Sequence, residues 1–396
     1  MERSETRQLV AGARAAAAQG QRVALATVVR VLGSAYRREG AGMLVGEDGA
    51  QTCMLSGGCL EGEVVEVALE VIASGTAQLA RYDLSEDALW GLGIGCGGSL
   101  DILIERVTGD ALLEAWLDAL EDAGQPETRR GAVLVTPLGG AAGRLLVPEE
   151  GSARGDLWRG ETRAAALMDA AVLHARALLA LPEAPSGART FFTQGQATQQ
   201  GQATQEVPGG EAELFFTVSH PAPELVIFGA GHDAVPLARL AVSLGYDVRV
   251  VDARASFLTP ARFPGAALDL LSPEDFAQHL VLGPRSHALI MNHHLERDRA
   301  ALRCALESPS PYVGVLGPRS RFEKLLAGLT SEGVTPNAAS LARVRSPVGL
   351  RIGAETPQEV ALSVVGELMA LRRRQGGGFL DGEEGRIHPP RGQAAR

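Results

Sequence analysis

The sequence predicts an α/β protein, in which a mixed α+β N-terminal domain is followed by a Rossmann-like domain with a doubly wound parallel sheet. Two observations carry this prediction. In the second half of the 396 residues, buried-strand patterns alternate strictly with helical patterns, which is typical of a parallel sheet covered by helices on both faces. In the first half, strand patterns follow one another in neighbouring runs, which indicates a mixed arrangement. The expected boundaries are 1–185 for the N-terminal domain, 186–222 for a flexible Gln/Thr/Gly segment and connecting strand, 223–375 for the Rossmann-like domain and 376–396 for a disordered tail.

Elements of the first half follow from side-chain type and spacing. β-branched residues crowd the segment after Arg22 and glycine ends it, so a buried strand is expected there. The pair Asp48-Gly49 predicts a hairpin turn. From Leu60 onwards apolar residues recur at helical spacing, so a helix is expected to begin there. Further helices are expected over 5–19, 111–121 and 162–181, and further strands at SLDILIERV, GAVLVTPLGG, GRLLVPE and ELFFTV.

Elements of the second half repeat a strand–helix unit. The expected strands are LVIF, DVRVVD, AALDL, HALIMN and YVGVLG, and the segments between them, near 233–244, 272–282, 297–308 and 320–329, are helix-like. A last helix is expected over 356–373, with Thr356 as its N-cap and Pro357 at its first helical position.

Charge and cysteine content exclude several classes of protein. The net charge is −10, so the sequence has no basic footprint for nucleic acid. No apolar run approaches the roughly 20 residues of a transmembrane helix, and the start does not resemble a signal peptide. Four cysteines are too few for a disulfide scaffold of this size, so a reducing cytoplasm is expected. A cysteine with a special role would then be reactive or a ligand.

A dinucleotide fingerprint opens the second half. Gly229, Gly231 and Ala234 form a Gly-x-Gly-x-x-Ala pattern between a strand and a helix, and Asp252 ends the next strand. In such a motif the glycines allow phosphate to approach the helix N-terminus, and the acid accepts a hydrogen bond from a ribose hydroxyl. The pattern therefore predicts a nucleotide site, with a Rossmann scaffold whose pocket is empty or adapted as the alternative.

Three histidines lie near this fingerprint. His232 stands at the helix entrance, where a neutral imidazole would face the phosphate, either as a hydrogen-bonding cap or as a ligand. His293 and His294 follow a strand at its carboxyl end. Adjacent strand residues point in opposite directions, so at most one of the two should enter the pocket. Their spacing matches no standard zinc pattern, and no metal ligands are assigned.

Two cysteines are framed by glycine. Cys59 follows Gly57 and Gly58 at a helix N-terminus, whose positive end favours a thiolate. Cys96 is followed by Gly97 and Gly98, whose amides are suited to an anion-binding nest.

Basic side chains lie upstream of these cysteines. Arg37 and Arg38 stand in a loop between strands and are suited to phosphate or carboxylate. The combination predicts a site for an anionic, sulfur-seeking or metal-bearing group. The alternative is that each cysteine is a small buried hydrophobe, as is expected for Cys53 and Cys304.

These blocks resemble a known family. ATVVRVLGSAYRREGAGMLV, SGGCLEGEV and GIGCGG are similar to signature blocks of the xanthine dehydrogenase accessory family, XdhC/CoxI-like, and LVIFGAGH, YVGVLGPRSR and VGLRIGAETPQEVALSVVGEL resemble its second domain. The similarity covers roughly residues 20 to 105 and 214 to 370. One departure is Tyr36, which stands where proline is common in the family.

The resemblance implies a cytoplasmic chaperone that performs no turnover. Such proteins bind the molybdenum cofactor, protect it during sulfuration and insert it into a xanthine dehydrogenase-type molybdenum hydroxylase. The implied partners are the apo-enzyme and a cysteine desulfurase, and a homodimer is expected only because delivery proteins often pair. By motif, Cys59 and Cys96 match the family's glycine-framed cysteines, and Arg37 and Arg38 match its basic loop.

Two other functions stay open at this point. The first is an NAD(P)-dependent oxidoreductase that uses the Rossmann domain. It is disfavoured by the single lysine, Lys324, and by the lack of an evident histidine–carboxylate pair. The second is a redox-sensing module in which Cys59 and Cys96 form a reversible disulfide.

Overall fold

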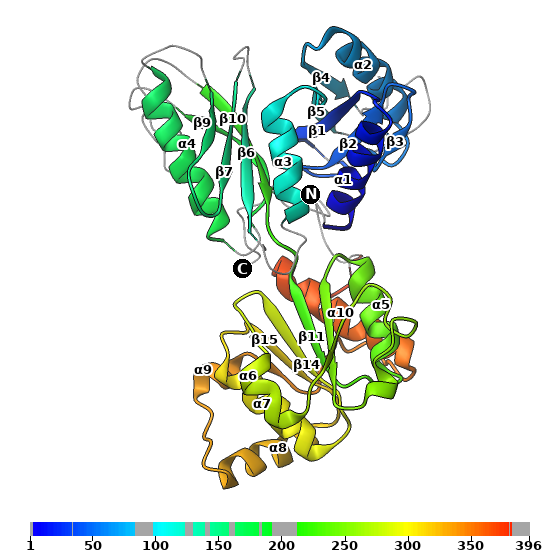
Figure 1. Cartoon of the computed structure of the whole chain (residues 1–396), viewed down its shortest axis with the longest axis vertical. Coiled ribbons are helices and arrows are strands. Elements are labelled where there is room, and N and C mark those ends of the chain that lie inside the picture. The colour runs from blue at the N-terminus through cyan, green and yellow to red at the C-terminus, as the bar shows by residue number, and fades with distance from the viewer. Residues whose placement is uncertain are drawn as a thin grey trace. The chain divides into compact units, whose positions relative to one another are not determined.

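The computed structural model describes residues 3–33, 35–83, 98–122, 130–138, 143–157, 163–181, 184–191, 212–379 and 381. The chain divides into two compact units, Met1–Pro221 and Ala222–Arg396 (Figure 1). None of the described helices is both long and apolar enough to cross a membrane.

The first unit opens with a five-stranded antiparallel sheet of order β3-β2-β1-β5-β4. Its central strand β1 is largely apolar because both of its faces are covered. Ala24, Ala26 and Val28 pack under helix α2, whereas Val23 and Leu25 pack against helices α1 and α3 on the other face (Figure 1). The strands are β1 (Val23–Leu32), β2 (Gly42–Gly46), β3 (Gln51–Thr52), β4 (Gln78–Asp83) and β5 (Ser99–Arg106), and the helices are α1 (Arg3–Ala18), α2 (Glu61–Ser74) and α3 (Ala111–Asp122).

A second antiparallel sheet, of order β8-β7-β6-β10-β9, completes this unit, and helix α4 (Arg163–Leu179) packs on it. Its strands are β6 (Ala132–Pro137), β7 (Arg144–Pro148), β8 (Arg154–Asp156), β9 (Gly187–Phe191) and β10 (Ala212–Ser219). The prediction of a flexible segment from residue 186 is wrong for β9, which pairs with β10 and buries Phe191 against Phe216. Residues 192–211 lie outside the described part of the chain.

Ion pairs join the two sheets. Arg30 of β1 holds Glu213 of β10, with 2.6 Å between Nη2 and Oε1, and also pairs with Asp101 of β5. Arg144 of β7 lies 2.6 Å from the carboxylate of Glu105 in β5. The first unit is therefore built as two sheets fixed to each other by charge as well as by a shared apolar layer.

The second unit is a six-stranded parallel sheet of order β13-β12-β11-β14-β15-β16. Its strands are β11 (Glu224–Phe228), β12 (Asp247–Asp252), β13 (Ala267–Leu270), β14 (Ser286–Ile290), β15 (Tyr312–Val315) and β16 (Val344–Arg345). This order is the Rossmann arrangement, and it confirms the predicted doubly wound sheet.

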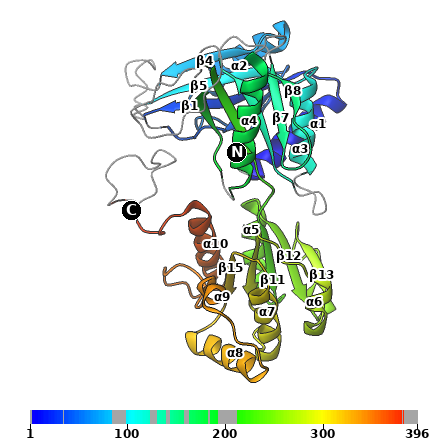
Figure 2. The same ribbon diagram turned by 90° about the vertical axis from the view of Figure 1, so that its left-hand side faces the viewer.

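Helices cover both faces of this sheet (Figure 2). The helices α5 (Ala234–Ser243) and α10 (Pro357–Arg373) pack on one face, and α6 (Phe276–His279), α7 (Leu295–Glu307) and α8 (Arg319–Ser331) pack on the other, while the short α9 (Ala338–Ala342) precedes β16. The predicted Thr356 cap is present, because its side chain accepts from the Glu359 amide in a capping box. The predicted helix near 272–282 is shorter than expected, a 3₁₀ turn at Pro273–Asp275 followed by α6.

Candidate functional site

The loop between β3 and α2 carries an accessible thiol. Gly57 and Gly58 have φ values of 93° and 113°, in the left-handed region that glycine alone adopts without strain. A Cβ placed on Gly58 would have no atom within 4 Å, so the backbone there faces open space. Cys59 follows directly and is exposed. The structure thus places the Cys59 sulfur where a bulky group can approach.

Glu61, the first residue of α2, stabilises this loop by accepting hydrogen bonds from its backbone amides. Its buried carboxylate accepts from the amides of Leu55, Ser56 and Gly58 at 3.0, 2.8 and 2.9 Å. It also accepts from the Ser56 hydroxyl at 2.6 Å. Burial alone would raise the pKa of Glu61, but the hydrogen bonds from the side chain and amide of Ser56 and from Leu55 outweigh it and lower the pKa to about 2. This role was not predicted from the sequence.

The same contacts change the expected electrostatics of the helix start. The Cys59 and Leu60 amides donate to the Ser56 hydroxyl oxygen at 3.1 and 3.0 Å, and Leu60 also donates to Glu61. The amides at the positive end of α2 therefore have internal acceptors, and an anionic carboxylate already lies there. This arrangement does not support the predicted preference of the helix end for a Cys59 thiolate.

Arg37, predicted from the sequence as a ligand for an anion, is engaged by an internal carboxylate in the structure. Its guanidinium forms a two-pronged ion pair with Glu5 of α1, with 2.6 Å between Nη2 and Oε2, and the hydrogen bonds to Glu5 raise the pKa of Arg37. The neighbouring Cys53 thiol donates to the Glu5 carbonyl oxygen at 3.6 Å. Arg38 is half-buried, and its carbonyl oxygen accepts from the Ala41 amide.

The other two described cysteines pack against core clusters, as expected. Cys53 and Cys304 are half-buried, and burial raises the pKa of each thiol to about 11. Both thiols are therefore neutral at physiological pH.

For the second glycine-framed cysteine, Cys96, the structure describes only residues near it in the sequence. Cys96 and Gly97 lie outside the described residues, whereas Gly98 is buried just before β5. The register pairs both Leu32 and Asp83 with Ser99, so the described residues on either side of 84–97 lie where β1 ends.

The start of α2 lies at this end of the sheet as well. The Ile72 carbonyl oxygen, in the last turn of α2, lies 3.4 Å from Arg22 and 3.5 Å from Arg106, which are at the other end of β1 and β5. The loops that lead to Arg37, Cys59 and Cys96 thus begin at one end of the first sheet.

At the carboxyl edge of the second sheet, close packing requires glycine at the first fingerprint position. Gly229 has φ 117°, and a Cβ there would lie 2.7 Å from the Met291 carbonyl oxygen. A Cβ on Gly231 would lie 2.5 Å from the carboxylate of Asp233. Gly229 is therefore required by backbone contacts within this unit, whereas the Asp233 side chain beside Gly231 could move aside.

Asp252 does not present a free acceptor to a ribose. Its buried carboxylate accepts from the Ala230 amide at 2.8 Å and from Arg254, whose Nε and Nη2 lie at 2.9 and 2.7 Å. Although burial by itself raises the pKa of Asp252, the hydrogen bonds from Arg254 and Ala230 lower it. Arg254 in turn stacks on the Phe257 ring at 4.0 Å.

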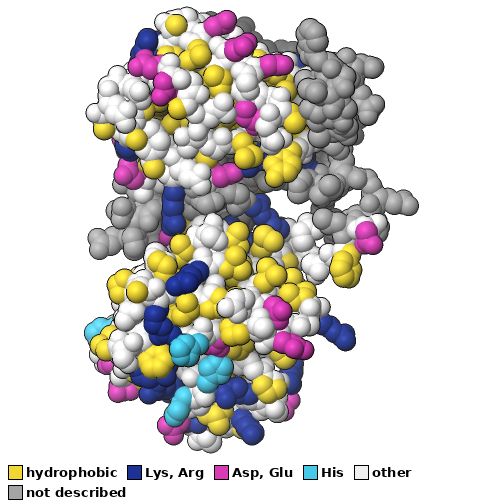
Figure 3. All heavy atoms as spheres, turned by 90° about the vertical axis from the view of Figure 1, so that its right-hand side faces the viewer, with side chains coloured by type: hydrophobic (Ala, Val, Ile, Leu, Met, Phe, Trp, Pro, Cys, Tyr) yellow, Lys and Arg dark blue, Asp and Glu magenta, His cyan; other side chains and the backbone are white. Residues whose placement is uncertain are grey.

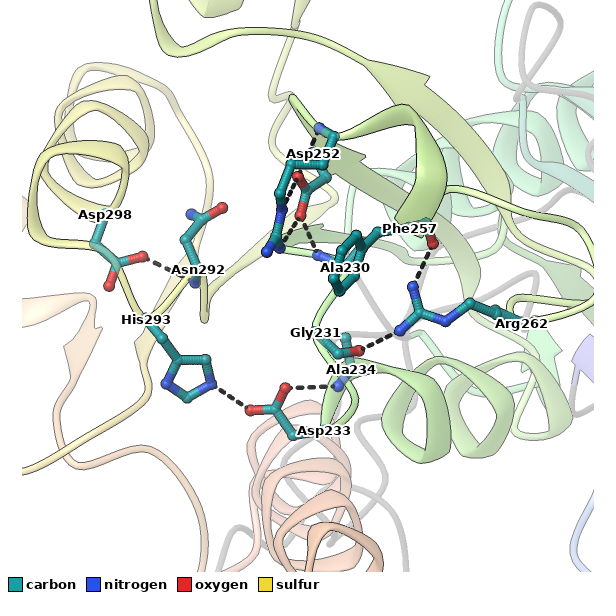
Figure 4. A network of polar contacts seen from close by, with 11 residues as sticks. Ala230, Gly231, Asp233, Ala234, Asp252, Phe257, Arg262, Asn292, His293 and Asp298 are labelled. Atoms are coloured by element: carbon teal, nitrogen blue, oxygen red, sulfur yellow. Dashed lines mark hydrogen bonds and ion pairs between the residues drawn. The ribbon is translucent and has the colours of Figure 1, made fainter.

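The start of α5 is likewise filled by an internal carboxylate. Asp233 accepts from the Ala234 amide at 3.1 Å, and its other oxygen lies 2.7 Å from Nε2 of His293 (Figure 4). Asp233 is therefore the cap, while His232 is exposed, with its ring 6.4 Å from that of Phe257. An internal carboxylate therefore lies at the helix start for which the sequence predicted a phosphate, and this role of Asp233 was not predicted from the sequence.

Histidine side chains group with basic ones on the surface of the second unit (Figure 3). His293 and His294 are both exposed, and only His293 is directed to Asp233. Within the described ranges, no group of three or more histidine, cysteine or acidic side chains could hold a metal ion.

Comparison with known proteins gives matches in both units. Residues 16–83 match the XdhC and CoxI family, and residues 225–368 match the XdhC Rossmann domain. A probable xanthine dehydrogenase subunit of Bacillus subtilis is 31% identical over 357 residues, which is 88% of this chain and 93% of that protein. The chain belongs to the XdhC and CoxI family.

Two further similarities agree with this family. The "Molybdenum cofactor insertion chaperone PaoD" of Escherichia coli is 25% identical over 90% of this chain and 85% of its own length. A crystal structure described as a xanthine dehydrogenase from Bacillus halodurans is 28% identical, with a TM-score of 0.70 over 94% of this chain and 98% of that one. The resemblance identified in the sequence is therefore confirmed, together with the fold class.

The matched ranges can be compared with the predicted site residues. The range 16–83 contains Arg37 and Cys59, and the matched Rossmann domain contains the fingerprint and Asp252. Cys96 falls between the two matched ranges.

Proposed function

We propose that this protein binds the molybdenum cofactor at the Cys59 loop, protects it during sulfuration and inserts it into a xanthine dehydrogenase-type molybdenum hydroxylase. The observation that carries the proposal is an exposed thiol on bare glycine backbone, at the end of the sheet where the Cys96 segment also joins. The name of the PaoD relative supports the same role.

The residues present fit the sulfur chemistry of this cofactor. Cysteine sulfur is a soft ligand that suits molybdenum or an exchangeable sulfur, and the open space at Gly58 leaves room for a large group beside it. Arg37 would serve by fixing the neighbouring loop to α1. This role requires no general acid or base, so we propose a maturation factor without turnover.

The partners follow from the chemistry of delivery. The apo-hydroxylase would accept the cofactor and a cysteine desulfurase would supply sulfur, both in a reducing cytoplasm that keeps Cys59 as a thiol. A homodimer is the assembly we propose, to be checked by light scattering after gel filtration.

The Rossmann unit is proposed as a scaffold rather than a dinucleotide site. The ribose acceptor Asp252 is held by Arg254, and the carboxylate of Asp233 stands at the start of α5, where pyrophosphate would lie. These contacts weaken the alternative of an NAD(P)-dependent oxidoreductase.

The decisive test is molybdenum content after anaerobic mixing with the cofactor and desalting. Wild type is expected to retain about one molybdenum per chain, and Cys59→Ala and Cys96→Ala to lose it while keeping their thermal stability. Cys304→Ala, which removes a half-buried thiol of the other unit, is the matched control. A folded wild type that retains no molybdenum would refute the proposal. Loss of thiols under mild oxidation without metal would favour the redox-sensing alternative.

A further inference from the structure

Large apolar side chains are exposed around the Cys59 loop. Tyr36 is 65% exposed, Leu32 at the end of β1 is 46% exposed, and Met54 in the Cys59 loop is 45% exposed. Tyr36 is set on the neighbouring loop, and its ring is the largest of these surfaces. Of these side chains, Tyr36 contacts the loop at Gly57, and its exposed aromatic ring offers a large apolar surface to a ligand.

The Tyr36 ring is held in place by its surroundings. A Cβ placed on Gly57 would lie 3.6 Å from Cδ1 of the ring, so the aromatic side chain rests directly against the glycine backbone. The next residue, Arg37, ties the loop to α1 through Glu5. Because the ring is already positioned, stacking on its free surface would lose little additional conformational entropy.

We infer that Tyr36 is a stacking platform for the flat pyrimidine ring of a pterin, bound so that its sulfur or metal end faces Cys59. This inference rests on the proposed function, because it takes the ligand of the Cys59 loop to be the cofactor. Offset stacking on an aromatic ring is favourable for any flat π-system, so the platform selects for ring shape rather than for a particular hydrogen-bond pattern.

Two variants separate stacking from the hydroxyl group. Tyr36→Phe keeps the ring and should bind as wild type does, whereas Tyr36→Leu should weaken retention of the cofactor about tenfold. Leu79→Ala is the matched control, since Leu79 is an apolar side chain of β4 with the same exposure as Leu32, 46%. Thermal unfolding of each variant checks that the fold is unchanged.

A second probe makes the inference independent of molybdenum. Free neopterin, which carries the ring without metal or dithiolene, is measured by equilibrium dialysis against wild type and the same variants. If Tyr36→Leu binds neopterin more weakly than wild type while Tyr36→Phe and Leu79→Ala do not, the platform is supported. This holds even if wild type retains no molybdenum and the proposed function fails. Equal binding of neopterin and equal molybdenum retention by wild type and Tyr36→Leu would overturn the platform and leave the proposed function intact. Loss of binding to the client enzyme with unchanged neopterin binding would also overturn it, and would assign Tyr36 to a protein-docking surface.

Discussion

At the scale of single residues, two carboxylates decide what the two candidate sites can do. Glu61 satisfies amides that would otherwise be free at the start of α2, and so it shapes the loop that presents Cys59. Asp233 does the same at the start of α5 and pairs with His293. In both places an internal anion lies where an isolated helix would attract an external one. The first site is left with an exposed thiol, while at the second the groups that a dinucleotide would use are engaged by the chain's own side chains.

The low pKa of Glu61 predicts a defined pH dependence of stability. Since the folded-state pKa, about 2, is below the ordinary value of 4.5, the ionised carboxylate stabilises the folded state above about pH 4.5, and this contribution is lost as the pH falls towards 2. Glu61→Gln is therefore expected to lower the urea midpoint at pH 7 and to reduce its dependence on pH between 5 and 3. Glu63→Gln, an exposed change in the same helix turn, is the control. If the urea midpoints of wild type and Glu61→Gln change equally with pH across this range, the stabilising role of the ionised Glu61 carboxylate is contradicted.

The contacts of Asp252 predict the behaviour of the second unit towards nucleotides. Because Arg254 and Ala230 already engage the carboxylate, titration of wild type with NAD or NADP by calorimetry should give no measurable heat of binding. Tight binding of either dinucleotide would restore the oxidoreductase alternative.

At the scale of elements, the loop between β3 and α2 should be especially sensitive to substitution. Its glycines hold left-handed backbone, whereas Gly62, one turn later in α2, is exposed with no atom near its missing Cβ. Substitution of glycine by alanine should therefore have opposite effects on the free energy of unfolding at Gly58 and at Gly62.

Gly58→Ala is expected to lower the free energy of unfolding by about 1–2 kcal/mol, because alanine is strained at positive φ. Gly62→Ala should raise it by up to about 1 kcal/mol, because alanine favours the helix. Urea unfolding of both variants measures the difference. A loss of stability in both would show that the loop is not the strained element.

Sequence patterns predicted the elements better than the contacts between them. The strands of the second unit are mostly buried and have apolar sequences, and the Thr356 cap has a local signature, so both were found. Strand β9 was missed because Arg189 and Thr190 lie beside a polar tract and the only large apolar residue of the strand is Phe191. The pairs Arg37–Glu5 and Asp233–His293 join residues 32 and 60 positions apart. Nothing local in the sequence distinguishes these tertiary pairs from solvated charges.

At the scale of the whole molecule, the proposed cofactor loop and the proposed scaffold belong to different units. Residues of Met1–Pro221 make the contacts that shape the Cys59 loop. They include the ion pair of Arg37 with Glu5 and the hydrogen bonds from the loop amides to Glu61 of α2. The two sheets of this unit share ion pairs and an apolar layer of their own.

A fragment ending at Pro221 is therefore expected to fold cooperatively and to retain molybdenum as the full chain does. Calorimetric unfolding of the fragment and metal analysis after desalting test the two halves of this prediction. A folded fragment that fails to retain molybdenum would show that the second unit contributes ligands to the cofactor.

The hydrogen bonds of Glu61 also bear on how the proposed cofactor would be released. Glu61 and Ser56 hold the loop through hydrogen bonds of its own. We therefore expect that binding and release of the proposed cofactor require no refolding of this loop. Transfer to the acceptor enzyme would then depend on which of the two proteins binds the cofactor with the higher affinity.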